Sequence, residues 1–276
     1  MTRDPEHSEG HGAGTWHYGL IARWWAEFNT AEPEEVAYYG AAVRRFGEPA
    51  LDLGCGTGRL LLPLLAQGLD VDGVDISPDM VAYAAALATA AGHAPMLVAQ
   101  ALHELDLPRR YRTIYVCGVF GIGGDRDHDR EALRRAHAHL EPGGALVLWH
   151  ELPWAGHDDH GWARWLPGHR DDLPRAWRDA GDRRQAADGD EIELIKRLVE
   201  FDPYRQRHVL EMRARLWHDG ALVREEHHAL AENLYFAQEV LLMLEAAGFR
   251  DVGVEAAYAG RQATPDDGTV IFTARR

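Results

Sequence analysis

Three glycines and one aspartate are the residues of this chain whose types and spacing point most clearly to ligand chemistry. Gly54, Gly56 and Gly58 alternate directly after the apolar run 50–53, and Asp75 closes a second apolar run about one helix later. A strand, a glycine turn and a helix N-terminus expose backbone N–H groups, and glycine lets a ligand approach them closely. The pattern therefore predicts a site for a negatively charged or nucleotide-like ligand.

Two common phosphate-binding loops do not fit these residues. A dinucleotide-binding fold places its third glycine three residues after the second, and that position here is Arg59. A P-loop needs a lysine after its last glycine, and this loop has none. A nicotinamide oxidoreductase is accordingly disfavoured.

The loop resembles the first motif of the class I S-adenosylmethionine (SAM) dependent methyltransferases of the small-molecule type. In that family an acidic residue precedes glycines at alternate positions, as Asp52 does here, and a second acidic residue ends the second strand, as Asp75 does. SAM carries no phosphate, but its amino-acid end needs a close backbone turn and its ribose diol needs a carboxylate acceptor. The resemblance therefore implies SAM as the cofactor, S-adenosylhomocysteine (SAH) as the product, and Asp75 as the acceptor for both ribose hydroxyls.

The same resemblance implies a wider set of cofactor contacts. The family's adenine-binding loop matches residues 99–108, but its usual acid is replaced by Ala101, so Leu102 and the backbone are expected to hold the ring. Residues 16–25 resemble a lid helix, from which Tyr18 and Arg23 are expected to close over the cofactor. The full expected set is Tyr18, Arg23, Asp52, Gly54, Cys55, Gly56, Gly58, Asp75, Ile76, Met80, Ala101, Leu102, Cys117, Gly118 and Phe120.

Catalytic candidates follow from the end of the fifth expected strand. Methyl transfer is an in-line displacement in which the protein supplies alignment and, for an oxygen acceptor, a base. His150 and Glu151 stand where strand ends face the cleft of such folds. Adjacent strand residues point in opposite directions, so the pattern leaves open which of the two faces inward, and His150 can also be a structural core histidine. His227 and His228 are further candidates.

The elements that must position these residues alternate from residue 49 onward between apolar strands and helical patterns, which predicts a parallel sheet covered on both faces. The alternation stops after residue 152, and three apolar–polar alternating stretches follow, with turn signals at 202–203 and 219–220. We predict an α/β fold, a Rossmann-like doubly wound seven-stranded sheet with an inserted antiparallel β cap. The expected parts are an arm and lid helices (1–48), the SAM-binding core (49–152 and 236–276) and a substrate cap (153–235).

The charge composition of the chain limits the kinds of binding partner that we expect. The 276 residues carry 29 Lys and Arg against 44 Asp and Glu, a net charge of −15, which disfavours nucleic acid and anionic membrane surfaces. The two cysteines, Cys55 and Cys117, are expected to be reduced thiols. No signal peptide or membrane-spanning stretch is recognised, so a cytoplasmic monomer or homodimer without a metal is expected.

Together these patterns predict methyl transfer from SAM to an oxygen or nitrogen atom of a small metabolite, as in natural-product biosynthesis. Trp154, Trp162, Trp165, Trp177, Tyr204 and Tyr235 gather in the cap segment, which suits an apolar or aromatic acceptor, although they can equally form the cap's own core. The alternative is a relative that binds SAM or SAH without transferring a methyl group, with a cyclase-like or regulatory role.

Overall fold

The computed structural model describes residues 15–155 and 162–276. The seven-stranded sheet contains β1 (Ala50–Leu53), β2 (Val71–Asp75), β3 (Leu97–Ala99), β4 (Tyr111–Cys117), β5 (Leu140–Glu151), β10 (Arg250–Ala256) and β11 (Thr269–Arg275). Its strand order is β10-β11-β5-β4-β1-β2-β3. The first five strands in sequence run parallel, whereas β11 is antiparallel to both β5 and β10. The predicted α/β fold with its seven-stranded sheet is confirmed.

Helices cover both faces of this sheet, as the alternation of strands and helices predicts. On one face α5 (Arg126–His139) and α6 (Ala237–Ala246) pack into a core with the sheet. On the other face α2 (Pro33–Phe46) and α3 (Leu61–Ala66) form a second core. The helix α4 (Pro78–Ala90) follows β2, and Ser77 caps it by accepting a hydrogen bond from Met80 N at 3.2 Å. A short 3₁₀ turn, η1 (Leu102–Glu104), follows β3.

A second, four-stranded antiparallel sheet lies between β5 and α6 in the sequence. It contains β6 (Asp182–Gln185), β7 (Glu191–Asp202), β8 (Arg207–His218) and β9 (Ala221–Asn233), in that order. Its last three strands are those that the alternating pattern predicts. The short and exposed β6 lacks an apolar alternation, so the sequence does not indicate it. A second 3₁₀ turn, η2 (Ala163–Trp165), precedes this sheet, which we call the cap sheet.

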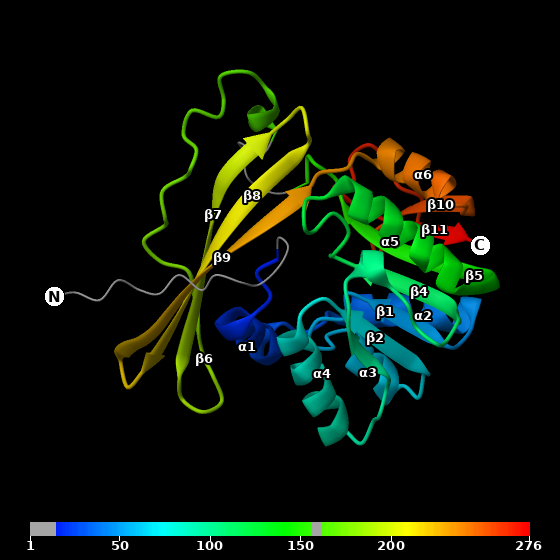
Figure 1. The fold of residues 1–276 in the computed structure, drawn as a ribbon, viewed down its shortest axis with the longest axis horizontal. Helices are drawn as coiled ribbons and strands as arrows, with labels where there is room; N and C mark the ends of the chain where they lie inside the picture. The colour runs from blue at the N-terminus through cyan, green and yellow to red at the C-terminus, as the bar shows by residue number, and fades with distance from the viewer. Residues whose placement is uncertain (1–14, 156–161) are drawn as a thin grey trace.

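The first helix, α1 (Gly19–Phe28), lies between the cap sheet and α4 (Figure 1). Its apolar side chains pack with residues of β7, β8 and β9 in one core cluster, which includes Leu20, Ile21, Trp24, Ile192, Met212 and Leu230. Toward the seven-stranded core, Gly19 N donates a hydrogen bond to Asp79 Oδ2 at 2.9 Å and Ser77 Oγ donates to the His17 carbonyl at 2.5 Å. The helix therefore connects the two sheets, with its apolar side on the cap sheet and further contacts to α4.

Candidate active site

The side chain of Asp75 holds the glycine loop between β1 and α3 in place through hydrogen bonds. One carboxylate oxygen accepts a hydrogen bond from Gly56 N and the other from Ser77 N, both at 2.9 Å. Burial raises the pKa of Asp75, while these two backbone donors lower it. Each oxygen keeps a second lone pair for a ligand. One aspartate thus orders the loop and the start of α4 and remains able to accept further hydrogen bonds.

The loop needs glycine for two different reasons. All three glycines have positive φ, between +53° and +91°. A Cβ on Gly54 would lie 2.5 Å from Val119 Cγ2, so protein atoms occupy that space. A Cβ on Gly56 would meet no protein atom within 4 Å. The space above Gly56 therefore belongs to a cavity, which a ligand can enter.

That cavity, the loop cavity, has a volume of about 460 Å³ and extends from the glycine loop to η1 and the N-terminus of α5. The predicted residues that line it are Gly54, Gly56, Asp75, Ile76, Met80, Ala101, Leu102, Gly118 and Phe120. Four elements that are distant in the sequence therefore bring their predicted residues to one place. All four contribute at the carboxyl ends of parallel strands, where ligands bind in open α/β sheets.

Four other predicted residues lie in or next to the loop but do not line the cavity. Asp52 and Cys55 are buried, and burial raises the pKa of Asp52 to about 7. Gly58 turns toward Leu62, whose Cγ would lie 2.9 Å from an added Cβ. Cys117 Sγ accepts from Arg59 Nη2 at 3.4 Å. Both cysteines are free thiols, as predicted.

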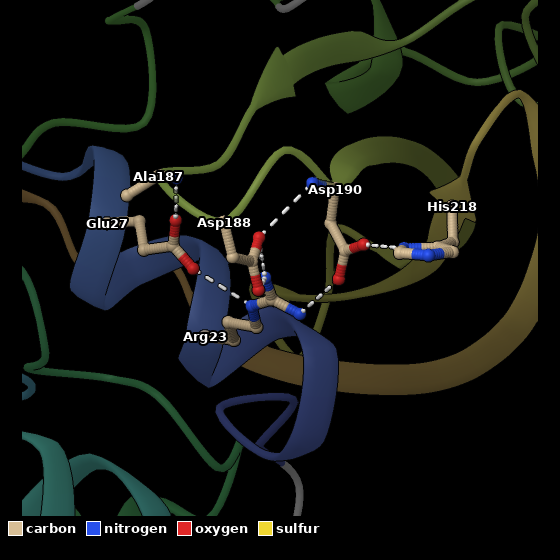
Figure 2. A network of polar contacts seen from close by, with 6 residues as sticks. All are labelled: Arg23, Glu27, Ala187, Asp188, Asp190 and His218. Atoms are coloured by element: carbon tan, nitrogen blue, oxygen red, sulfur yellow. Dashed lines mark hydrogen bonds and ion pairs between the residues drawn. The ribbon is translucent and has the colours of Figure 1, made fainter.

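Arg23, predicted to contact the cofactor, does not line the loop cavity. Its guanidinium donates to Glu27 at 2.9 Å, to Asp188 at 2.8 and 2.9 Å and to Asp190 at 3.0 Å (Figure 2). Asp190 also pairs with His218 Nδ1 at 2.7 Å. The physical reason is that the polar side of α1 faces the acidic β6–β7 turn, so Arg23 holds the helix to the cap sheet.

Tyr18, the other predicted lid residue, is buried just before α1. Burial raises the pKa of its phenol, and the negative charges of Asp75 and Asp79 raise it further. The residue therefore lies near the predicted ribose acceptor without lining the loop cavity. From the same segment it is Thr15, His17 and Trp25 that line the cavity.

Arg59 is a lining residue that the sequence did not assign to the ligand. Its Nη1 donates to Glu35 Oε2 at 2.5 Å, and its guanidinium borders the loop cavity. Arg59 directly follows the third glycine of the loop, so its sequence position could have identified it as a ligand contact. At the opposite end of the cavity the rings of His103 and His128 stack with their centroids 3.6 Å apart.

A second cavity, the cap cavity, has a volume of about 510 Å³ and lies between the end of β5, the cap sheet and η2. It shares five lining residues with the loop cavity, namely His17, Trp25, Gly118, Phe120 and Ile122. Trp149, Trp165, Phe201, Leu210 and Leu230 give it apolar walls. Among the aromatic residues predicted to gather in the cap segment, Trp165 lines it, whereas Tyr204 is 95% exposed and Trp177 stacks on Arg197 and Arg213.

Both predicted catalytic residues line the cap cavity, in different environments. His150 is buried, and its Nε2–H donates to the Tyr235 carbonyl at 2.8 Å, since a carbonyl can only accept. Burial lowers the pKa of His150 and thereby favours the neutral ring. The side chain of Glu151 is exposed at the cavity, where desolvation and then the charge of Glu232 raise its pKa.

A histidine–carboxylate pair in the same cavity was not predicted. His208 on β8 and Glu232 on β9 face each other directly, with Nε2 and Oε2 2.8 Å apart. The other two candidates, His227 and His228, line neither cavity. His227 pairs with Glu225 at 3.1 Å and His228 with Glu226 at 3.2 Å.

Comparisons with known proteins agree with this geometry. Residues 50–144 match a family model described as a methyltransferase domain. A search of curated proteins finds no match. The resemblance to the class I SAM-dependent methyltransferases is confirmed by this match and by the fold.

Solved structures with the same fold extend the similarity over the whole chain. A sugar N-methyltransferase from Streptoalloteichus is 22% identical with a TM-score of 0.69, and the match covers 100% of this chain and 98% of the other. An amino pentose methyltransferase from Micromonospora echinaspora, solved with SAM bound, is 21% identical with a TM-score of 0.61 and coverages of 96% and 100%. A SAM-dependent methyltransferase from Clostridium acetobutylicum is 15% identical with a TM-score of 0.67 and coverages of 92% and 97%. The cofactor prediction, SAM, agrees with the methyltransferase-domain match and with the SAM-bound relative.

Within residues 15–155 and 162–276, no helix is long and apolar enough to span a bilayer. The same residues contain no group of three or more histidine, cysteine or carboxylate side chains arranged to hold a metal ion.

Proposed function

We propose that this protein transfers a methyl group from SAM to a nitrogen or oxygen atom of a small metabolite. The observation that carries the proposal is the pair of adjoining cavities, which share His17, Trp25, Gly118, Phe120 and Ile122. One cavity contains the glycine loop and Asp75, and the other is closed by the cap sheet. Because the two cavities border the same five residues, ligands bound in them lie next to each other, as the direct contact of an in-line displacement requires.

The residues of the loop cavity fit the cofactor. The open space above Gly56 admits a ligand against the backbone, and Asp75 retains lone pairs for a ribose diol. We assign the cofactor's carboxylate to Arg59, the cation that borders the cavity beside the loop. Leu102 and His103 stand at the end where the resemblance places adenine. When bound, SAM supplies an electrophilic methyl group on a sulfonium.

The cap cavity would hold the acceptor. Its walls combine indole and phenyl rings with carboxylates and a lysine, which suits a ring-containing metabolite with a polar group. Two of the structural relatives are described as a sugar N-methyltransferase and an amino pentose methyltransferase. We therefore propose an amine on a small ring compound as the preferred acceptor, with a hydroxyl as the second choice. Within this site Glu151 is proposed to contact the acceptor, and His150 to shape the cavity wall.

The cofactor half of the proposal is tested by thermal unfolding with SAM, SAH and NAD added separately. A ligand at about a hundred times its dissociation constant stabilises the folded state by roughly 2.7 kcal/mol, which corresponds to a shift of roughly 5–10 °C for a chain of this size. We expect SAM and SAH to raise the midpoint and NAD to leave it unchanged. A protein that responds to NAD alone would contradict the proposal.

The transfer half is tested by SAH release from SAM with a panel of acceptors. The panel contains methyl glycosides of 3- and 4-amino-deoxyhexoses, their hydroxyl counterparts, benzylamine and phenol. We expect turnover with an amine. Binding of SAH without turnover of any panel member would favour a SAM-binding relative that does not transfer methyl groups.

A further inference from the structure

The paired side chains His208 and Glu232 occupy a place in the cap cavity that no predicted role uses. They lie directly opposite each other on β8 and β9, and the His208 Nε2–H donates to Glu232 Oε2 at 2.8 Å. The side chain of His208 is 15% exposed and that of Glu232 is 33% exposed. This hydrogen bond fixes the ring tautomer and leaves Nδ1 as an acceptor for a proton.

Backbone hydrogen bonds attach this pair to the loop that follows β4. Ile122 forms an isolated bridge with Glu232, Gly123 N donates to the Ala231 carbonyl at 2.8 Å, and Asn233 N donates to the Gly121 carbonyl at 2.8 Å. A Cβ on Gly121 would lie 2.6 Å from the Asn233 carbonyl oxygen, so glycine is needed for this close approach. Ile122 lines both cavities. These bonds therefore hold Glu232 next to Ile122, which borders both ligand spaces.

His150, which lines the same cavity, is less suited to proton transfer. His150 is buried behind the strand end, and its Nε2–H is held by the Tyr235 carbonyl, which carries no charge to balance an imidazolium. Glu232 does carry that charge for His208. A histidine oriented by a carboxylate is the arrangement that supports a general base.

We propose that His208 is the general base of the transfer and that Glu232 positions it. This inference rests on the proposed function. The Nδ1 lone pair of His208 takes a proton from the acceptor's ammonium or hydroxyl group, and the electron pair so freed forms the new bond to the methyl carbon. The bond between that carbon and sulfur breaks with its electrons going to sulfur, which leaves neutral SAH. The imidazolium is balanced by Glu232 and returns its proton to solvent.

The test compares three variants with the best amine acceptor of the panel. H208N removes the imidazole that takes the proton, so kcat should fall about 10²–10⁴-fold at pH 7. E232Q keeps the hydrogen-bonding shape without the charge, and a loss of about 10-fold is expected. H228N is the matched control, because His228 also pairs with a glutamate on β9 but lines neither cavity. It should retain the wild-type kcat, and all three should bind SAH as the wild type does.

The pH profile separates a base from a structural residue. The deficit of H208N should shrink as pH rises, because deprotonation of the acceptor amine in solution replaces the missing base. The other ionisable groups that share the cavity are His17, His150, Glu151, Arg164, Lys196 and Glu232. These groups are still present in H208N. Any pH dependence of kcat that they cause would therefore appear in the variant as well as in the wild type.

Each remaining outcome overturns a distinct statement. A kcat for H208N within threefold of wild type, or an equal loss in H228N, would overturn the role of His208. A deficit that stays constant with pH would show that His208 is structural. If SAH binds but no acceptor is turned over, the transfer half of the proposed function fails and this inference fails with it. If SAH does not bind, the cofactor half fails.

Discussion

Gly56 and Gly68 show how two glycines with similar backbones can differ in importance. Both have positive φ, +53° and +79°, and neither would place a Cβ within 4 Å of another protein atom. Gly68 ends α3 at the surface, whereas Gly56 borders the loop cavity. A side chain costs similar backbone strain at either position, on the order of 1–2 kcal/mol. Only at Gly56 would it also occupy the space proposed for the cofactor.

We therefore expect Gly56→Ala and Gly68→Ala to lower the free energy of unfolding by similar amounts but to differ in ligand binding. SAH affinity should fall at least tenfold in Gly56→Ala and remain unchanged in Gly68→Ala. Isothermal titration calorimetry with SAH measures the affinities, and urea unfolding measures the stabilities. Equal SAH affinities in the two variants would mean that the loop is a turn without a ligand.

At the scale of elements, α1 is the part whose role differs most from the expectation. Its apolar side belongs to the cap core, and Arg23 joins Glu27 to the acidic β6–β7 turn (Figure 2). Arg23 was predicted to close over the cofactor, but its guanidinium already pairs with three protein carboxylates. Arg59 borders the loop cavity instead.

Arg23→Ala should thus destabilise the fold without weakening cofactor binding. Removing the guanidinium leaves Glu27, Asp188 and Asp190 close together, so we expect a loss of about 1 kcal/mol, smaller in 1 M salt. SAH affinity should stay within threefold of wild type. The matched control is Arg130→Ala, since Arg130 makes one exposed pair with Asp127 on α5 and should change neither quantity. A large drop in SAH affinity for Arg23→Ala alone would restore the original lid role.

Patterns of apolar residues and glycines predict some parts of this structure and not others. The strands β1 to β5 and the helices between them follow from apolar runs and glycine turns, and so does the convergence of Gly56, Asp75 and Leu102 at one end of the sheet. The element that Arg23 contacts could not be predicted. Helical periodicity identifies the polar side of a helix but not the element that packs against that side.

The pairing of His208 with Glu232 is a second feature that the sequence alone does not predict. The turn at Asp219–Gly220 pairs His218 with Ala221, and that register continued would set His208 opposite Ala231. The register shifts by one residue between Leu216 and Trp217, which brings Glu232 opposite His208. A shift of one residue turns every later side chain to the other face of the sheet. No residue pattern in the hairpin predicts this register shift. The pairing of His208 with Glu232 therefore follows only from the structure.

For the molecule as a whole, the half-buried His17 makes stability depend on pH. Burial lowers the pKa of His17 to about 4, and its Nδ1 lies 2.6 Å from Thr15 Oγ1. Between pH 6.5 and 4 the unfolded chain therefore binds a proton that the folded chain does not, and stability falls as the pH falls through this window, by roughly 3 kcal/mol at most. Asp52 acts in the opposite direction, because its pKa is raised to about 7 and its contribution is lost as the pH rises toward that value.

The contribution of His17 is isolated by comparing wild type with His17→Asn. We expect the stability of the variant relative to wild type to improve steadily as the pH is lowered from 7 to 4.5, because the variant has no imidazole to protonate. Urea unfolding at pH 7, 6, 5 and 4.5 gives the two curves, and the contribution of Asp52 cancels in their difference. A difference that does not change with pH would show that His17 is not held neutral in the folded protein.

The wall shared by the two cavities also bears on the order in which ligands come and go. His17 and Trp25 line both cavities, and they belong to the segment that packs with the cap sheet. A ligand that fixes these two side chains on one side sets the surface that the other ligand meets. By linkage, whatever factor the acceptor adds to the affinity for SAM, SAM must add to the affinity for the acceptor. A favourable coupling between SAH and the methylated product would likewise weaken the binding of SAH once that product has left.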